Sequence, residues 1–542
     1  MLAASLLLCC LAAPLPTHLE MLFHSRDRSD LRPVPQQRAQ PIADLPAAQR
    51  FLSKYGWTEP QPRSRTPAAL APAVRRFQKV NALPVSGELD TATLEAMNRP
   101  RCGVPDTLAP ALPRARPKRS LPRLPPRSAP QIPSKASRAP GKAPRVFPRR
   151  TLSWRLVTEG YTGQLAAAEQ RRVLALAFRM WSEVAPLHFR EDLSGPVAAV
   201  DIRLGFGRGR HLGCPRTFDG SGQELAHAWR LGDVHFDDDE HFTAPSSNAG
   251  ISLLRVAVHE IGHVLGLPHS YRTGSIMQPN YPQQEPRFEL DQADRRAVQK
   301  LYGACEGPFD VAFDWIRRER NPNGRTSLRF STYFFRRSWY WLYENRNNRT
   351  RYGDPLPISL GWHGVPARDL DAFVHVWGVG RDERYFFKGN QYWRYDSEKD
   401  QAHSKDEHGR SYPKLISEGF PGVPSPLDTA FYDLQKQLII FFQASLVFAF
   451  NISSNRVLDS YPKKLTEVFQ ATVPRDHPLR SLDSAYFSFA QRSVFLFKGR
   501  HYWKVVGGQD GMGMPPYTLL PKQLVSRTWF DICDVHVSTL SM

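Results

Sequence analysis

A segment near the middle of the chain, HEIGHVLGLPH, has the residue types and spacing of a catalytic metal site. His259 and His263 are four residues apart, so on a helix both imidazoles lie on one face and can bind the same ion. Gly266 allows the chain to turn sharply out of the helix, which lets His269 return as a third ligand. Three neutral histidines leave one position of a Zn²⁺ ion open for water, and Glu260 is placed to accept that water's proton. The segment therefore predicts a hydrolase.

A structural zinc site, or a hydrogen-bonded core, is the alternative interpretation of these histidines. A structural zinc ion normally takes a fourth protein ligand and has no use for a carboxylate beside the metal. Five fixed residues at this spacing arise by chance with a probability on the order of one in a thousand. Met277, in the segment GSIMQPNY, is typical of the turn beneath the zinc ion of metzincin proteases. The catalytic interpretation is therefore favoured.

Two stretches of regular secondary structure surround this site in the sequence. From residue 151 to about 303, strand-like pieces such as TLSWRLV alternate with helical ones such as AAEQRRVLALAFRMWSEV, which predicts an α/β domain. From about residue 47 to 98, apolar residues recur three and four apart, which predicts a small domain of short amphipathic helices. This helical domain ends in the segment PRCGVPD.

After residue 309 the sequence contains four similar units that are rich in aromatic and β-forming residues. The units begin with Asp310, Asp371, Asp428 and Asp483, at offsets of 61, 57 and 55 residues. Four such units predict a four-bladed β-propeller. Cys305 and Cys533 bracket the units, as a disulfide that closes the propeller would. Asn348 and Asn451 begin glycosylation sequons, a pattern that also arises often by chance.

The formal net charge is +20, and much of the excess lies in one place. Residues 107–150 contain twelve Lys or Arg, eleven Pro and no Asp or Glu. A basic, Pro-rich segment without apolar periodicity is typical of an unfolded linker. No recognition helix or aromatic-basic sheet motif accompanies the charge, so we expect no binding to nucleic acid. The apolar content of 41% excludes a wholly disordered or collagen-like chain.

The N-terminal segment MLAASLLLCCLAAPLP has the apolar run of a secretory signal peptide, although it lacks the usual basic residues before that run. The alternative is a short buried helix or an incomplete signal. Cys9 and Cys10 would leave with the signal. No other run reaches the roughly 18 apolar residues that a membrane span requires, and the tail after Cys533 is too short for an anchor signal. We therefore expect a soluble protein, secreted to the extracellular space or matrix.

The segment PRCGVPD, the pattern HExxHxxGxxH and the methionine turn together make the chain resemble the matrix metalloproteinase family over nearly its whole length. The resemblance implies a small helical, peptidoglycan-binding-like prodomain, an α/β metzincin zinc-protease domain and a four-bladed, all-β hemopexin-like propeller. The expected ranges are a signal peptide over 1–20, a prodomain over 21–106, a linker over 107–150, a catalytic domain over 151–303, a propeller over 304–534 and a tail over 535–542. The implied activity is that of a zinc endopeptidase acting on extracellular-matrix or cell-surface proteins, with tissue inhibitors of metalloproteinases among its partners.

By the same resemblance, Cys102 keeps the enzyme latent. Its thiolate would fill the fourth zinc position and exclude water until the prodomain is cut away, and Arg101 would pair with Asp106 to hold the loop. A thiolate is a better zinc ligand than water, which agrees with this role, and the alternative is an unpaired thiol in a loop. Basic sites ending at Arg119 and Arg150 resemble the sites of furin-like activating proteases, although basic pairs are common in any such linker.

The segment FDGSGQELAHAWRLGDVHFDDDE resembles the family's structural zinc and calcium region. His227 and His235 match the two zinc-binding histidines. The expected Ca²⁺ ligands, through carboxylate and backbone oxygens, are Asp219, Gly220, Gly222, Glu224, Asp237 and Glu240. A turn glycine and a solvated acidic run are the alternatives for these residues.

This region departs from the family pattern in two ways. Where a His-x-Asp pair is expected, RHLGCP has Leu212 and Cys214, with His211 one residue early. A structural zinc ion would take some combination of His211 and Cys214, or else Cys214 is a small buried residue in a domain that has lost the ion. The following loop is also short, which puts a second calcium site, suggested by Asp201 and Asp233, in doubt.

The sequence also bears on inserts, substrate specificity and alternative functions. About 23 residues separate His235 from His259, which leaves no room for the fibronectin-like inserts of the gelatinases. Specificity should depend on a pocket beyond the zinc ion, walled by residues 277–281 and the loop to Phe288. The alternative function is an extracellular binding module that acts through the propeller, although the intact Glu260 counts against a silent protease. The basic linker could also bind polyanions such as heparan sulfate before processing.

Overall fold

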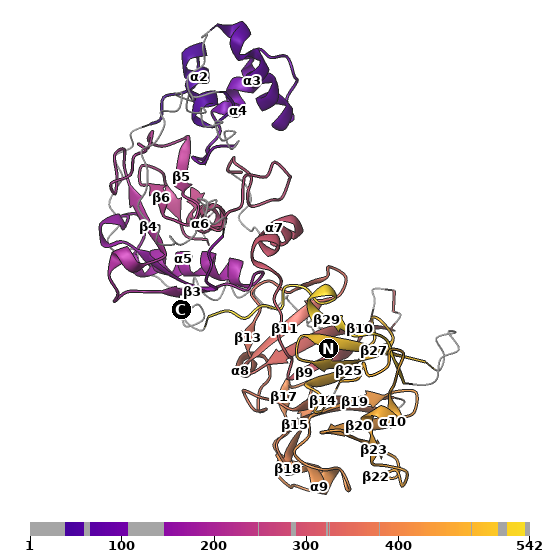
Figure 1. Ribbon diagram of the computed structural model, residues 1–542. Helices are drawn as coiled ribbons and strands as arrows, with labels where there is room; N and C mark the ends of the chain where they lie inside the picture. Colours follow the sequence, from indigo (N-terminus) through magenta and orange to yellow (C-terminus); the bar gives the residue numbers. More distant parts are fainter. Residues whose placement is uncertain are drawn as a thin grey trace, which may run out of the picture. The chain divides into compact units, whose positions relative to one another are not determined.

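The computed structural model describes residues 38–58, 66–106, 146–245, 247, 249–282, 289–320, 323–324, 326–378, 380–478, 480–507 and 517–536. The expected signal peptide with Cys9 and Cys10, most of the linker with Arg119, and Phe288 lie outside these residues. The chain forms two compact units, one chiefly of Ser25–Trp181 and Leu187–Tyr302 and the other chiefly of Gly303–Val535 (Figure 1). Among the described residues, no helix has the length and apolar character needed to cross a membrane.

The first part of the first unit is a small helical domain, as the apolar spacing predicts. Its helices are α2 (Leu45–Lys54), α3 (Pro67–Val80) and α4 (Thr91–Met97). Each helix is preceded by a residue whose side chain accepts a backbone N–H of the first turn: Asp44, Thr66 and Asp90. Aromatic side chains fill the core, where the ring centroids of Phe51 and Phe77 are 5.6 Å apart.

The rest of the first unit is the predicted α/β domain, built on a six-stranded sheet of order β1-β5-β6-β4-β2-β3. The strands are β1 (Arg101–Cys102), β2 (Thr151–Leu156), β3 (His188–Glu191), β4 (Ile202–Gly207), β5 (Glu224–Ala228) and β6 (Val234–Asp237). The other elements are α5 (Ala167–Ser182), α6 (Leu253–Val264), α7 (Gln292–Tyr302), η1 (Thr158–Gly160), η2 (Val197–Ala199), β7 (Phe242–Thr243) and β8 (Ile251–Ser252). Only β5 and β6 pair antiparallel in the main sheet. Because β1 lies at the end of the helical domain, that domain supplies an edge strand beside β5.

The second unit is a four-bladed β-propeller, as the four repeats predict. Blade 1 comprises β9 (Val311–Arg320), β10 (Thr326–Arg336), β11 (Trp339–Glu344), β12 (Arg349–Thr350), β13 (Leu356–Pro357) and the short helix α8 (Ile358–Gly361). Blade 2 comprises β14 (Ala372–Gly378), β15 (Arg381–Lys388), β16 (Gln391–Asp396), β17 (Gln401–Ala402), β18 (Lys414–Leu415) and α9 (Ile416–Gly419). Blade 3 comprises β19 (Thr429–Asp433), β20 (Leu438–Gln443), β21 (Leu446–Asn451), β22 (Arg456–Val457), β23 (Lys463–Lys464) and α10 (Leu465–Val468). Blade 4 comprises β24 (Gln470–Ala471), β25 (Ser484–Ser488), β26 (Ser493–Lys498), β27 (His501–Val506), β28 (Thr518–Leu519), β29 (Gln523–Leu524) and η3 (Val525–Arg527).

The repeated aspartate has the same structural role in every blade. It precedes the first long strand, and its Oδ2 accepts a backbone N–H from the turn between the second and third long strands. The donors are Arg337, Gly389, Ala444 and Gly499, in blade order. Each donor has a positive φ, between 52° and 61°, so the aspartate stabilises a left-handed turn residue. This shared hydrogen bond explains why the motif recurs with each blade.

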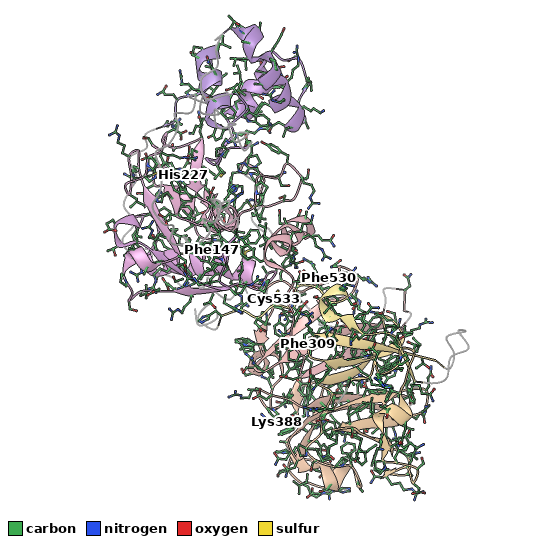
Figure 2. The ribbon with its side chains drawn as sticks, in the orientation of Figure 1. Phe147, His227, Phe309, Lys388, Phe530 and Cys533 are labelled. Atoms are coloured by element: carbon green, nitrogen blue, oxygen red, sulfur yellow. A yellow bond between two sulfur atoms is a disulfide. The ribbon has the colours of Figure 1, made fainter. Side chains whose placement is uncertain are left out.

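The disulfide Cys305–Cys533 is formed, as predicted, and it ties the start of blade 1 to the end of blade 4. Phe309, at the start of blade 1, packs in the same apolar cluster as Trp529 and Ile532 of the C-terminal segment. Figure 2 labels Phe309, Phe530 and Cys533 in this part of the propeller. The bond and the apolar cluster together close the ring of blades.

Candidate metal centres

Helix α6 places the first two histidines of the HExxHxxGxxH pattern on one face. Ser252 caps the helix by accepting the backbone N–H of Arg255, and every residue of α6 is buried. His259 donates from Nδ1 to the carbonyl of Ile276 at 2.7 Å. His263 donates from Nδ1 to the carbonyl of Leu267 at 2.8 Å. Both Nε2 atoms are thereby left as acceptors, and they lie 3.1 Å apart.

Two further ligand atoms complete what we call the catalytic centre: Cys102, His259, His263 and His269. Gly266 has a φ of 104°, which carries the chain out of α6 and returns His269 to the other two histidines. Ligand atoms from all four residues lie within 4.8 Å of one another. The Nε2 of His269 is buried without a hydrogen-bond partner in the part of the chain that the structure describes, and burial lowers the pKa of His259 to about 3. Neutral imidazoles, one thiol and an orphaned buried nitrogen fit a tetrahedral Zn²⁺ ion.

Glu260 lies beside this centre and is 1% exposed. Burial raises the pKa of Glu260 to about 8, and the hydrogen bond with Cys102 opposes that rise. Among the described residues, its Oε2 has no hydrogen-bond partner. An unpaired, buried carboxyl oxygen beside a metal centre is available to exchange a proton.

The pro-segment around Cys102 lies between β5 and the segment around Pro279 and forms backbone hydrogen bonds with both. On one side Arg101 donates its backbone N–H to Gln223 at 2.7 Å, and Gly103 donates to Ala226 at 2.7 Å. On the other side Cys102 donates its backbone N–H to Pro279 at 2.9 Å. The segment is therefore extended and pairs with neighbouring backbone on both of its sides.

Ionic and aromatic contacts hold this loop. Arg101 lies 2.5 Å from Asp106, as the resemblance implies, with side chains that are 3% and 0% exposed. The guanidinium of Arg101 stacks 3.6 Å from the ring centroid of Tyr55, and Trp57 donates from Nε1 to Asp106 at 2.8 Å. Asp106 also lies 2.9 Å from Nδ1 of His269. The loop is thus anchored both to the helical domain and to a metal-binding histidine.

Met277 packs beneath the catalytic centre and is 2% exposed. A Cβ added to Gly262 in α6 would lie 2.4 Å from the sulfur of Met277, so the glycine permits this close approach. Asp294 of α7 accepts hydrogen bonds from the hydroxyl of Ser275 and the backbone of Ile276, which fixes the turn. The turn in turn supplies the carbonyl that orients His259.

A second group of potential ligands, His211, Cys214, His227 and His235, forms what we call the second metal centre. Ligand atoms from all four lie within 4.8 Å of one another. The two residues between His211 and Cys214 have left-handed φ values of 44° and 69°, and Cys214 donates its backbone N–H to the carbonyl of His211 at 2.7 Å. This tight turn places His211 and Cys214 beside the two histidines of the sheet. Figure 2 labels His227 on β5.

Hydrogen bonds orient the ligands of the second metal centre. Glu224 lies 2.6 Å from Nδ1 of His227, whose Nε2 is 3.4 Å from the sulfur of Cys214. His211 donates from Nδ1 to a backbone carbonyl at 2.8 Å, and its Nε2 is 3.1 Å from Nδ1 of His235. Burial, then the neighbouring histidines, lowers the pKa of His235 to about 3. Three imidazoles and one thiol in this arrangement also fit Zn²⁺.

The expected calcium ligands divide into two groups. Burial raises the pKa of Asp237 to about 8 and that of Glu240 to about 7. No described residue forms a hydrogen bond with Oδ2 of Asp237. Gly222 donates its backbone N–H to Glu240 at 2.6 Å. The carboxylate of Glu224, in contrast, points to His227 and to a lysine of the helical domain. Asp237 and Glu240 therefore fit a Ca²⁺ ion through their side chains.

Comparisons with known proteins identify the family. The profile Matrixin matches residues 146–303, Putative peptidoglycan binding domain matches 43–97 and Hemopexin matches 379–425. Matrix metalloproteinase-21 of Homo sapiens is 65% identical over 570 residues and covers 100% of both chains. Matrix metalloproteinase-21 of Mus musculus is 63% identical over 571 residues with the same coverage, and Stromelysin-1 of Equus caballus is 29% identical over 81% of this chain and 84% of its own.

The chain belongs to the matrix metalloproteinase family. The family resemblance predicted from the sequence is thus confirmed, and the segment RHLGCPRTFDGSGQELAHAW already suggests the subtype of the Homo sapiens and Mus musculus relatives. The matrixin domain is that of a zinc metalloendopeptidase, and the prodomain makes it a latent one. The family implies zinc and usually calcium.

A small pocket of about 30 Å³ lies beside the catalytic centre of this matrix metalloproteinase. As the sequence predicts, Pro279, Asn280 and Tyr281 form part of its wall. Sequence analysis missed Arg255 of α6, which also lines the pocket and lies 5.9 Å from the ring centroid of Tyr281. Its position four residues before His259 could have indicated that it shares the helix face of the metal ligands.

The carboxylates of the doubtful second calcium site are engaged by other groups. Arg203 binds Asp233 through two hydrogen bonds, of 2.9 and 2.6 Å. Asp201 accepts hydrogen bonds from Ser153 and an ion pair from Arg149. Protein donors therefore balance these charges, in agreement with the shortened loop.

The remaining predicted sites fall at the surface or at strand ends. Arg150 is exposed immediately before β2, and its guanidinium donates to the carbonyl of Tyr302. Asn348 is exposed, with a φ of 50°, in the turn between β11 and β12. Asn451 ends β21, and its Oδ1 accepts the backbone N–H of Ser453 at 2.9 Å. Both asparagines remain predicted glycosylation sites.

Proposed function

We propose that the chain is a secreted, latent zinc endopeptidase that cleaves extracellular-matrix or cell-surface proteins after a furin-like protease removes its prodomain. The observation that carries the proposal is the convergence of Cys102 with three histidines, beside the unpaired oxygen of Glu260. The signal-like N-terminus supports secretion, and the basic linker supports furin-type cleavage after Arg119 or Arg150. Tissue inhibitors of metalloproteinases are expected partners through the family.

We assign a zinc ion to each centre and a calcium ion to Asp237 and Glu240. The imidazoles of His259, His263 and His269 would hold the catalytic ion. A bound Zn²⁺ supplies a Lewis acid that polarises a peptide carbonyl and acidifies water. Glu260 accepts the proton of the attacking water and then donates it to the leaving amine, which requires a carboxyl group that can be both charged and neutral.

Substrate would follow the backbone edges that the pro-segment vacates. With Cys102 gone, the carbonyls of Gln223 and Ala226 on one side and that of Pro279 on the other become free to pair. An extended peptide has the backbone groups to satisfy both edges, which is how strand addition confers affinity without a fixed sequence. The 30 Å³ pocket beside the catalytic centre would then select a small side chain.

A quenched fluorescent peptide library tests this proposal. Furin-treated protein is compared with untreated protein, with the Glu260→Ala variant and with treated protein in a zinc chelator. We expect cleavage only in treated wild type without chelator. Absence of cleavage in protein shown to be processed, folded and zinc-loaded would refute general proteolysis and favour the propeller as a binding module.

A further inference from the structure

One buried carboxylate, that of Glu224 at the start of β5, contacts both the prodomain and the second metal centre. Lys54, the last residue of α2 in the prodomain, places its Nζ 2.5 Å from Oε2 of Glu224. The other oxygen, Oε1, lies 2.6 Å from Nδ1 of His227. Glu224 is 1% exposed, so its charge depends on these two partners rather than on water.

The contact with His227 determines which ring nitrogen can bind metal. A carboxylate at Nδ1 holds the proton there, and Nε2 is left free as a metal ligand. This Nε2 faces the sulfur of Cys214 at 3.4 Å, inside the second metal centre. Partners of this kind typically change metal affinity about 10- to 100-fold when they are removed.

The prodomain covers the same carboxylate from a second direction. A Cβ added to Gly103, next to Cys102, would lie 2.0 Å from Oε1 of Glu224, so the pro-segment backbone packs directly on this group. Gly103 also donates its backbone N–H to Ala226 of β5 at 2.7 Å. Removal of the prodomain would therefore take away the cation and the cover of Glu224 together.

Lys54 lies closest to Glu224 among its acidic partners. Its ammonium group also lies 3.3 Å from Oδ2 of Asp219, so it bridges two carboxylates of the catalytic domain. The side chain of Lys54 is 39% exposed, whereas that of Glu224 is 1% exposed, so the lysine reaches in from the rim to a buried partner. Lys79, an exposed lysine near the end of α3, has no such partner among the contacts of the described residues.

We propose that Lys54 is a positioning residue that couples prodomain docking to metal binding at the second metal centre, by holding Glu224 where it orients His227. The coupling rests on the zinc occupancy of that centre assigned above. Because coupling free energies are reciprocal, the docked prodomain strengthens metal binding at the second metal centre, and metal there strengthens docking. We expect the stronger binding to be measurable as slower release of the metal. The docked prodomain thus interacts with both metal centres: Cys102 binds at the catalytic centre, and Lys54 acts on the second metal centre through Glu224.

The test measures zinc release to a metallochromic chelator from full-length latent protein and from the processed protein after the prodomain is separated. The variants are Lys54→Met, the conservative Lys54→Arg and the matched control Lys79→Met. The phase belonging to the second metal centre is the one that disappears in Cys214→Ala. We expect this phase to be about ten-fold faster in latent Lys54→Met than in latent wild type. The release rates of Lys79→Met and Lys54→Arg should equal that of wild type.

The processed wild type provides a comparison that needs no variant. It has lost Lys54 with its prodomain, so its second zinc should leave about as fast as that of latent Lys54→Met. Equal release rates in latent and processed wild type would overturn the coupling even if Lys54→Met failed to fold. Two zinc ions per latent chain with equal rates would overturn the coupling alone, whereas one zinc ion per chain would overturn the assigned occupancy as well.

Discussion

The two metal centres use the same kinds of ligand, three histidines and one cysteine, but they differ in where the cysteine comes from. Cys102 belongs to the prodomain strand β1, which proteolysis can remove, whereas Cys214 lies in the same domain as its histidines. The glutamates beside them differ too. Glu260 has an unpaired oxygen, while both oxygens of Glu224 are engaged. Under the proposed function, the two sites differ because one thiol belongs to a removable segment and the other does not, although the ligand types are the same.

The largest expected difference lies between the two glutamates. Glu260→Gln should lower kcat/KM of the processed enzyme by about 10³-fold, because it removes the general base while leaving the histidines in place. Glu224→Gln should leave kcat/KM within about ten-fold, and it should weaken zinc binding at the second metal centre instead. Steady-state peptide cleavage with zinc quantification checks both. Equal losses of activity in the two variants would contradict the assignment of roles.

The next largest difference is expected between substitutions of the two cysteines. Cys102→Ser should raise peptide cleavage by the uncleaved chain at least about ten-fold, because a hydroxyl is a far poorer zinc ligand than a thiolate. Cys214→Ser should leave the chain latent and should lower its melting temperature. Activity assays before processing and thermal unfolding of both variants provide the measurement. An uncleaved Cys102→Ser chain as inactive as wild type would mean that the thiol does not maintain latency.

Stepwise metal removal from the processed enzyme should distinguish the catalytic centre from the second metal centre. A site with three protein ligands and an open position should lose zinc to a chelator before a closed site with four. Activity should therefore disappear first, and the melting temperature should fall only with loss of the second ion. The second step should remove about 4 kcal/mol of folding free energy if zinc was present at a thousand-fold excess over its Kd. Simultaneous loss of activity and stability would argue against two distinct centres.

The smallest effect is expected at Arg203, whose side chain is 43% exposed in its pair with Asp233. Arg203→Met should lower the free energy of unfolding by no more than about 1 kcal/mol, because solvent screens an exposed ion pair. Zinc content should stay unchanged. Chemical denaturation with a metal assay checks the prediction, and loss of the second zinc would show that this pair supports the metal centre.

The sequence predicted the catalytic centre in detail because its histidines lie in one helix and the turn that follows. Spacing on a helix fixes which side chains share a face, so His259 and His263 needed no tertiary information. The propeller was equally predictable from its repeats, and the structure adds the reason for the repeated aspartate. Spacing within one helix, or a repeat along the chain, predicts where residues lie without knowledge of the tertiary structure.

The second metal centre was less predictable because its ligands converge from separate strands and a turn. The placement of His211 and Cys214 depends on two consecutive left-handed residues, one of which, Leu212, is not glycine. Glu224 forms an ion pair with Lys54, which is distant in the sequence and belongs to another domain. Neither contact has a local signature that the sequence could have revealed.

The most direct test of the account is anomalous scattering at the zinc absorption edge from crystals of the full-length latent protein. We predict two zinc peaks: one bound by Cys102, His259, His263 and His269, and the other bound by His211, Cys214, His227 and His235. A catalytic zinc peak without the sulfur of Cys102 would contradict the mechanism of latency. A single peak would contradict the assignment of the second metal centre.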